Sequence, residues 1–231
     1  MKSKLFLIFF LVLLYGCAHK EHYIGEQYLG TKYLIDPLGE EKAPDKDPLL
    51  RTDAFDCMTF VETCLADGDI EKLNKIRYKD GKVDFINRNH FVETDWLNNN
   101  TDLVENVSNQ YGKTERKKIA IDKKSWFKKK HNINTSFKTQ HAVLEYIPYS
   151  EFKPVKTDKP LIVLFVAGNL NFYAKMGTGL SVVHMGFLLP DGMLRHASKT
   201  DGCVTDTDFN EYIQKHKKYK KHIGFALVEI K

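Results

Sequence analysis

Strand-like segments dominate the second half of this chain, and they constrain the fold more than any other sequence feature. Residues 161–167 form a nearly continuous apolar run, which is typical of a strand buried on both faces. The other strand-like segments are residues 143–147, 180–189, 193–197 and 223–230. Pro190-Asp191-Gly192 separates two of these segments and predicts a tight turn, so the two are expected to pair antiparallel.

A helix precedes these strand-like segments, with its start at residue 57. Its apolar residues fall on one helical stripe: Phe60, Val61, Cys64 and Leu65. Asp56 is well placed to cap the first turn, and Asp67-Gly68-Asp69 ends the helix. A second short helix is predicted over residues 70–77, followed by a turn at residues 79–82. A helix followed by a sheet predicts an α+β fold.

Three further segments are less regular. Residues 18–52 are interrupted by Gly and Pro and predict an arm that packs over the rest of the chain. Residues 102–111 predict a polar helix. Residues 113–134 are basic and weakly patterned, which leaves a basic insertion, or a surface helix with an edge strand, as the interpretation.

The first sixteen residues have the layout of an export signal. Lys2 and Lys4 precede an apolar run over residues 5–14 that is short for a membrane span. Leu14-Tyr15-Gly16-Cys17 resembles a bacterial lipobox, in which Cys17 would become a lipid anchor. The alternative is an ordinary secretory signal followed by an incidental cysteine.

Length and charge suit one domain that does not bind nucleic acid. Removal of residues 1–16 from the 231-residue chain leaves 215 residues, enough for a single domain over 17–231, expected to be monomeric. The formal net charge of +5 falls to +3 when Lys2 and Lys4 are removed. That charge is too small to indicate a nucleic-acid partner.

The cysteines after Cys17 do not form an obvious disulfide or zinc framework. They are Cys57, Cys64 and Cys203, an odd number. Cys57 and Cys64 would lie about 10 Å apart on one helix, beyond disulfide reach. A pairing of Cys64 with Cys203 stays open, and no CxxC or CxxH spacing indicates a metal.

Cys57 is the strongest candidate for chemistry. A thiol at a helix N-terminus lies near N–H groups that have no partner within the helix, and these can stabilise a thiolate or an oxyanion. His184 and His196 lie on the two segments joined by the 190–192 turn, so their rings are expected to meet. His184 would then act as the base and His196 would orient it. For either histidine alone, a buried structural role is the alternative.

These residues carry a family resemblance. Asp56-Cys57 at a helix start, His184-Met185-Gly186-Phe187 and His196-Ala197-Ser198 resemble the NlpC-type papain-like superfamily of bacterial cell-wall amidases and peptidases. The runs from Cys57 to Glu62 and from Arg88 to Phe91, with Asp95-Trp96, resemble its N-acetylmuramoyl-L-alanine amidase-like branch.

The resemblance implies a papain-like fold, with the nucleophile helix packed on an antiparallel sheet. It also implies a cofactor-free enzyme that cleaves the amide between N-acetylmuramic acid and L-alanine, with a preference for anhydro-muropeptides. Cys57 would be the nucleophile, His184 the base and His196 the orienting residue. Tyr33 resembles the tyrosine whose hydroxyl lies near the thiol in this superfamily.

The substrate-binding residues predicted beside Tyr33 and Asp56 come from one dense polar and aromatic segment: Arg88, His90, Asp95 and Trp96. A guanidinium can grip a carboxylate and an indole can stack on a sugar. The alternative is that Trp96 belongs to the core and Arg88 pairs with Asp95. The remaining histidines in polar surroundings are expected to face solvent: His131, His141, His216 and His222.

Two other functions remain open at this point. One is an endopeptidase that cuts cell-wall peptides after D-glutamate. The other is a non-catalytic envelope lipoprotein that binds muropeptides. Each is compatible with the expected location, which is the periplasmic side of a bacterial envelope, most simply the outer membrane, with Cys17 as the anchor.

Overall fold

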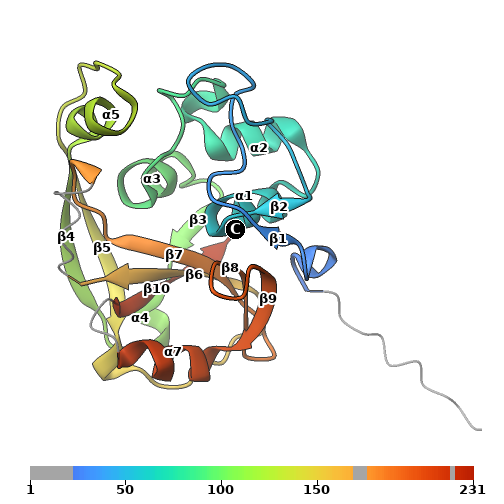
Figure 1. Cartoon of the computed structure of the whole chain (residues 1–231). Helices are drawn as coiled ribbons and strands as arrows, with labels where there is room; N and C mark the ends of the chain where they lie inside the picture. Colours follow the sequence, from blue (N-terminus) through green and yellow to red (C-terminus); the bar gives the residue numbers. More distant parts are fainter. Residues whose placement is uncertain (1–22, 169–175, 219–221) are drawn as a thin grey trace, which may run out of the picture.

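The computed structural model describes residues 23–168, 176–218 and 222–231 (Figure 1). The predicted signal peptide and Cys17 therefore lie outside the described residues. Ten strands of the described part form one sheet, which is flanked by helices, so the fold is α+β with a large, mostly antiparallel sheet. None of the helices in these ranges is long and apolar enough to span a bilayer.

The elements follow in chain order from a short N-terminal turn to a C-terminal strand. The strands are β1 (Lys32–Tyr33), β2 (Ala54–Phe55), β3 (Val104–Asn106), β4 (Glu115–Ile121), β5 (Gln140–Pro148), β6 (Leu161–Ala167), β7 (Val182–Leu188), β8 (Met193–Ser198), β9 (Cys203–Asp208) and β10 (His222–Ile230). The α-helices are α1 (Cys57–Ala66), α2 (Ile70–Arg77), α3 (Leu97–Asn99), α4 (Ser108–Tyr111), α5 (Lys123–His131) and α7 (Phe209–Lys217). The short turns are η1 (Glu26–Tyr28), η2 (Lys79–Gly81), the π turn η3 (Val92–Trp96) and η4 (Tyr149–Glu151).

The sheet runs in the order β2-β1-β9-β8-β7-β6-β10-β5-β4, and β3 pairs with β10 beside this path. β1 and β2 pair in parallel, and the other recorded pairs are antiparallel. β6 lies in the middle and every one of its residues is buried. The predicted antiparallel pairing across the 190–192 turn is confirmed, because β7 and β8 are neighbours.

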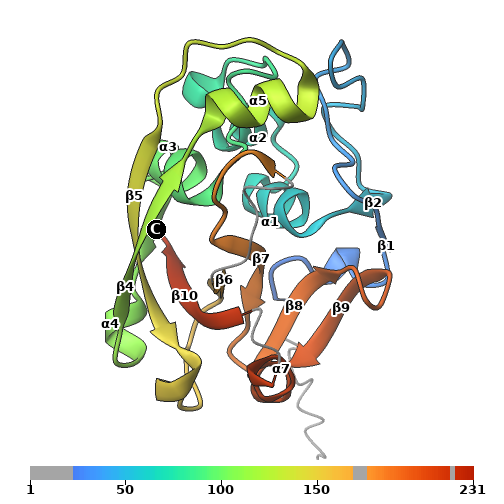
Figure 2. The same cartoon turned by 60° about the vertical axis from the view of Figure 1, so that its left-hand side comes forward.

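Hydrophobic clusters cover both faces of the sheet. Alternate residues of β6 face opposite ways: Leu164 belongs to the cluster that contains α1 and α5, and Phe165 to the cluster that contains α7. Figure 1 shows α1, α2 and α3 on one side of the central strands and α7 on the other. Figure 2 shows β4 and β5 as a long antiparallel pair, with α5 beyond its end.

The predicted helix at residue 57 is confirmed at both ends. Asp56 caps α1 by accepting a hydrogen bond from the Thr59 backbone N–H at 2.8 Å, while the Thr59 hydroxyl receives the Asp56 N–H at 3.0 Å. At the other end Asp67 adopts φ 52°, and its N–H donates to the Thr63 carbonyl. The predicted second helix matches α2.

The predicted polar helix over residues 102–111 is wrong. Val104–Asn106 instead forms β3, which pairs with Val228, Glu229 and Ile230 of β10. Helix α4 is limited to Ser108–Tyr111, and the Asn106 side chain accepts from the Ser108 N–H at 3.0 Å. Pairing with an available edge of β10 outweighs a weak local preference for helix.

The basic segment 113–134 forms an edge strand and a helix, β4 and α5. Trp126 and Phe127 of α5 are buried in the larger hydrophobic cluster. Lys123, at the start of α5, is also buried and forms an ion pair with Asp95 at 2.9 Å. The segment therefore contributes to the core as well as to the surface.

Candidate active site

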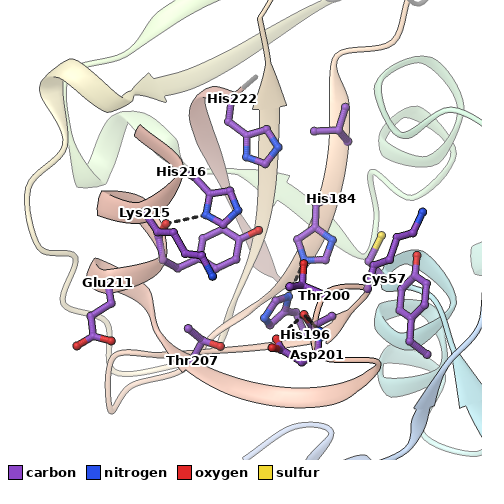
Figure 3. Close-up of a pocket in the computed structure, with 15 residues that line it drawn as sticks. Cys57, His184, His196, Thr200, Asp201, Thr207, Glu211, Lys215, His216 and His222 are labelled. Carbon is purple, nitrogen blue, oxygen red and sulfur yellow. Dashed lines mark hydrogen bonds between the residues drawn. The ribbon is translucent and has the colours of Figure 1, made fainter. Parts of the chain in front are cut away.

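A pocket of about 560 Å³ opens between the first turn of α1 and the helix α7 (Figure 3). Cys57, His184 and His196 all line it, so the structure brings together the three residues predicted to form the catalytic group. Figure 3 shows the sulfur of Cys57 and the ring of His184 at the same end of the pocket.

Cys57 is the first residue of α1, directly after the capping Asp56. Burial raises the pKa of its thiol to about 12, and the negative charge of Asp56 adds to the rise. The backbone N–H groups of Met185, Cys57 and Met58 act in the opposite direction but do not outweigh burial. In the resting state, desolvation of the thiol therefore exceeds the stabilising effect of the helix N-terminus on a thiolate. Cys57 is a neutral thiol at neutral pH.

A β-bulge sets the position of His184. The pairing of β6 with β7 shifts register between Phe165 and Val166, so Val183 is an extra residue just before His184. The His184 ring stacks on Phe165, with centroids 5.6 Å apart and planes at 23°. Burial, followed by the neighbouring His196, His222 and His216, holds the pKa of His184 well below its ordinary value. His184 is therefore a neutral imidazole at neutral pH.

His184 and His196 form a hydrogen bond of 2.7 Å between Nε2 of His184 and Nδ1 of His196. This bond occupies Nε2 of His184 and leaves Nδ1 as the nitrogen that can receive a proton from a thiol. Gly186 lets the two strands approach, because a Cβ there would lie 2.8 Å from the His196 Cβ and 2.7 Å from the Arg195 carbonyl oxygen. The geometry fits the predicted orienting contact between the two rings.

His196 is almost fully enclosed, with 3% of its surface exposed. Its Nε2 is buried without a hydrogen-bond partner among the described residues. Burial lowers the pKa of His196 to about 4, while Asp201 acts against that change. A neutral His196 can accept the Nε2 proton of His184 at its own Nδ1.

Tyr33 also lines the pocket, as the resemblance implied. It ends β1, whose Lys32 pairs with Cys203 of β9, so the arm before α1 is attached to the sheet at this point. Burial and then the proximity of Cys57 raise the pKa of Tyr33 to about 12, which keeps its hydroxyl protonated. The hydroxyl is a donor that a developing oxyanion can use.

Two histidines that were expected to face solvent also line the pocket, and that expectation is wrong for them. His216 of α7 and His222 of β10 stack with ring planes at 6° and centroids 5.1 Å apart. His216 stacks on Tyr212 at 4.0 Å as well. Phe209, Tyr212, Ile213 and His216 follow helical spacing i, i+3, i+4 and i+7, so this stripe is the sequence signal that indicates an inward His216. His141 is exposed, as expected.

Arg88 lies in a different place and does not line the Cys57 pocket. Its guanidinium binds both carboxylate oxygens of Glu40 at 2.8 Å, Asp45 at 2.6 Å and Asp36 at 3.2 Å. We call Arg88 with Asp36, Glu40 and Asp45 the Arg88 cluster. The partner predicted in the structural alternative was Asp95, whereas the observed partners come from the arm before α1. The cluster fastens that arm to the body of the domain.

The other four residues predicted to bind substrate are also engaged within the protein, and Asp56 is the N-cap of α1 and does not line the pocket. Trp96 is fully buried in the larger hydrophobic cluster, and Asp95 pairs with Lys123. His90 packs against Trp126, with ring centroids 4.6 Å apart, and its Nε2 contacts the Phe85 carbonyl at 2.7 Å. His131, expected in solvent, packs against Trp126 at 4.7 Å. These positions favour the structural interpretation of the segment.

Glu93 is a buried carboxylate that sequence patterns did not single out. Its Oε1 accepts hydrogen bonds from the backbone N–H of Ser181 at 2.6 Å and of Val182 at 2.5 Å, at the start of β7. Its Oε2 is buried and has no hydrogen-bond partner in the described part of the chain. Burial raises the pKa of Glu93. Glu93 fixes the end of the strand that carries His184.

The thiols of Cys57, Cys64 and Cys203 are all free, so the possible pairing of Cys64 with Cys203 is not formed. Cys64 is buried on α1. Within residues 23–168, 176–218 and 222–231, no group of three or more His, Cys, Asp or Glu side chains has an arrangement that could hold a metal ion.

The pocket therefore joins a thiol at a helix N-terminus to an imidazole that is oriented by a second imidazole. A neutral thiol beside a neutral imidazole can transfer its proton as the sulfur attacks an electrophilic carbon. The first-turn N–H groups of α1 and the Tyr33 hydroxyl can stabilise negative charge on the oxygen of that carbon. This is the set of groups that acyl transfer requires.

Comparison with known proteins finds similarity to amidase-like proteins. A family model described as AmiA-like, N-acetylmuramoyl-L-alanine amidase-like, matches residues 23–222. An N-acetylmuramoyl-L-alanine amidase from Bacteroides uniformis is similar in structure, with a TM-score of 0.65 and 26% identity over 90% of this chain and 97% of that chain. A protein from Legionella pneumophila shares the fold, with a TM-score of 0.80 and 24% identity over 90% and 86% of the two chains. None of the curated proteins matches the chain.

Proposed function

We propose that this chain, which belongs to the AmiA-like family of N-acetylmuramoyl-L-alanine amidase-like proteins, is a cysteine amidase. Its substrate is the amide between the lactyl group of N-acetylmuramic acid and L-alanine in peptidoglycan fragments, with anhydro-muropeptides preferred. The observation that carries the proposal is the pocket in which Cys57, His184 and His196 meet.

The first half of the reaction forms a thioester. Nδ1 of His184 takes the thiol proton as the Cys57 sulfur attacks the carbonyl carbon of the lactyl group. The carbonyl oxygen becomes an oxyanion, which the first-turn N–H groups of α1 stabilise. When the tetrahedral intermediate collapses, the carbon–nitrogen bond breaks and His184 returns the proton to the nitrogen of L-alanine. The peptide leaves with a free amino group.

The second half regenerates the thiol. Water replaces the peptide, His184 removes a proton from it, and the oxygen attacks the thioester carbon. Collapse of the second intermediate breaks the carbon–sulfur bond, and the proton on His184 passes to the sulfur. The sugar fragment leaves as a carboxylic acid, so one water is consumed for each amide cleaved.

His196 acts through His184. Its Nδ1 accepts the proton on Nε2 of His184, which keeps Nδ1 of His184 free to act as the base. The same hydrogen bond strengthens when His184 becomes an imidazolium. The neutral resting states of Cys57 and His184 support proton transfer during the attack, in place of a thiolate formed beforehand.

The finer fold assignment is part of the proposal. A papain-like fold of the NlpC type would combine a nucleophile at the start of a helix with a base on an adjacent antiparallel strand. The packing of α1 against β7 and β8 supports that assignment. One domain over residues 17–231, acting as a monomer, suits a site whose three central residues come from a single chain.

We also propose export and lipid anchoring through Cys17, with the domain on the periplasmic side of the envelope. The lipobox-like sequence before Cys17 supports this location. Replacement of Cys17 by serine should release the protein from the membrane fraction and abolish incorporation of labelled fatty acid. Retention in the membrane with no lipid on either protein contradicts the anchor.

The function is tested by incubation of purified protein with an anhydro-muropeptide and mass spectrometry of the products. The proposal predicts a peptide with a free alanine amino group and a muramic acid fragment with a free carboxyl group. Cys57→Ala should abolish the reaction. Cys64→Ala is the matched control, because it removes a buried thiol from the same helix and should retain activity.

The same assay separates the alternatives by fragment mass. Cleavage after D-glutamate with the alanine bond intact indicates an endopeptidase. Binding without product, unchanged by Cys57→Ala, indicates a muropeptide-binding protein. Either result, or full activity of Cys57→Ala, contradicts the proposed amidase.

A further inference from the structure

We propose that Lys215, His216 and His222 form a subsite that binds a carboxylate of the peptide leaving group. This inference rests on the proposed amidase function and specifies how the site recognises the peptide half of its substrate. We call these three residues the basic wall. All three line the same pocket as Cys57 and His184.

Contacts within the protein hold the two histidine rings of the basic wall in place. The stacked rings of His216 and His222 are nearly parallel, at 6°. Nδ1 of His216 lies 2.8 Å from the Tyr212 carbonyl oxygen, and because a carbonyl can only accept, Nδ1 is the donor. Nε2 of His216 is then the nitrogen that can meet a ligand. When protonated, an imidazole held in this way donates a hydrogen bond to a carboxylate at that nitrogen.

The reaction itself determines which half of the substrate meets this wall. His184 returns its proton to the departing nitrogen, so the peptide must lie on the His184 side of the Cys57 sulfur. In Figure 3, His216 and His222 lie on the side of His184 that is away from Cys57. The basic wall therefore borders the space that the departing peptide would occupy.

The dimensions fit a carboxylate two residues along the peptide. Two extended residues span about 7 Å. Ring centroids of His184 and Tyr212 are 6.4 Å apart, and His216 stacks on Tyr212 at 4.0 Å. The residue that follows L-alanine in the proposed substrate is glutamate, which carries a free carboxylate. Its carboxylate would reach the basic wall while the alanine nitrogen lies at His184.

Charge at this end of the pocket also favours an anion. Lys215 extends into the pocket in Figure 3, while Glu211, one turn earlier on α7, points away from the histidine rings. The other acid in the lining, Asp201, accepts a hydrogen bond from the Ser198 hydroxyl at 2.5 Å and lies in the turn beyond His196. Lys199 adds a second exposed positive charge to the lining. A carboxylate at the basic wall thus lies near the positive charge of Lys215.

Binding of the released peptide tests the subsite without any turnover. Calorimetry of the native protein with L-alanyl-D-glutamate should give an affinity about tenfold higher than with the analogue in which the α-carboxylate is an amide. Lys215→Met should reduce that preference about two- to threefold, because an exposed ammonium contributes modestly. His216→Leu, which keeps the packing on Tyr212, should remove most of it. Lys217→Met, an exposed lysine of the same helix outside the lining, should leave it unchanged.

Equal affinity for acid and amide, no measurable binding of either, or a preference that survives both Lys215→Met and His216→Leu would overturn the subsite. Failure of the proposed function has a different signature, which is the absence of alanine-bond cleavage in the muropeptide assay. The two results are therefore distinguishable, because the dipeptide measurement requires no chemistry.

Discussion

The Arg88 cluster and the Cys57 pocket both concentrate ionisable groups below the protein surface, but they differ in how those groups are used. In the Arg88 cluster the guanidinium meets three carboxylates, and Tyr78 adds a hydrogen bond to Glu40 at 3.0 Å. In the Cys57 pocket the thiol of Cys57 and the imidazole of His184 are neutral, their pKa values are displaced by burial, and both border open volume. The first arrangement holds two segments together, and the second leaves reactive atoms available.

Open volume beside reactive groups, and not the density of polar residues, distinguishes the Cys57 pocket. Polar and aromatic residues are dense around residues 88–96, yet burial against partners within the protein accounts for them. The catalytic candidates are fewer, and they are identified by the empty space beside a thiol and an oriented imidazole. Substitution of Cys57 or His184 should therefore affect turnover, whereas substitution in the Arg88 cluster should affect stability.

The largest expected effect is on turnover. His184→Ala removes the base and should lower kcat by about 10⁴-fold, while the midpoint of urea unfolding stays close to that of the native protein. His141→Ala, at an exposed position on β5, is the control and should retain full activity. A His184→Ala protein that keeps native kcat would remove the distinction between the two regions.

The next effect is on stability in the other region. Arg88→Met leaves the fully buried Glu40 side chain without its guanidinium partner and should cost about 3–5 kcal/mol in the free energy of unfolding. The fraction that remains folded should cleave muropeptide with native KM, since Arg88 does not line the pocket. A raised KM with unchanged stability would instead assign Arg88 to substrate binding.

A pH effect on stability distinguishes the neutral histidines from the charged cluster. The pKa of His196 is about 4 in the folded protein, below the ordinary value near 6.5 of an unfolded chain. The unfolded state therefore takes up the proton first, and stability falls as the pH decreases from about 6.5 to 4, by about 3 kcal/mol from this residue. Urea unfolding at several pH values should show a smaller loss for His196→Gln. An equal loss in both proteins contradicts the neutral, buried His196.

Glu93 shares features with both regions, because one carboxylate oxygen is paired and the other is not. Glu93→Ala leaves two buried backbone N–H groups without an acceptor and should cost about 2 kcal/mol in unfolding free energy. Glu93→Gln keeps an oxygen acceptor, so the cost in unfolding free energy should be less than about 1 kcal/mol. If Gln is as damaging as Ala, charge and not hydrogen bonding at β7 is the important property.

Local patterns predicted the elements that local interactions determine. The cap at Asp56, the apolar stripe of α1 and the five strand-like segments all depend on residues close in sequence, and each appears in the structure. The meeting of His184 with His196 followed from a single tight turn. Strand β9 and helix α7 were not predicted, although the helical spacing of the buried residues of α7 is visible in the sequence.

Distant partners could not be read from the sequence. Arg88 contacts carboxylates that lie 43 to 52 residues away in the sequence. The structural alternative had paired it with a nearer acid, Asp95. The thiol pKa of Cys57 depends on burial by the whole domain, and this burial outweighs the favourable helix N-terminus that the sequence indicates. His216 and His222 meet across α7 and β10. In each case the tertiary fold determines the outcome.

The thioester that Cys57 is proposed to form with the muramic acid fragment can be trapped. Native protein mixed with excess anhydro-muropeptide is quenched in acid within the first turnover, digested and analysed by mass spectrometry. We expect an adduct on the Cys57 peptide with the mass of the muramoyl acyl group, without L-alanine, and none on the Cys64 peptide. Release of product by the native protein together with native turnover by Cys57→Ala, and no adduct on Cys57, would contradict the proposed thioester.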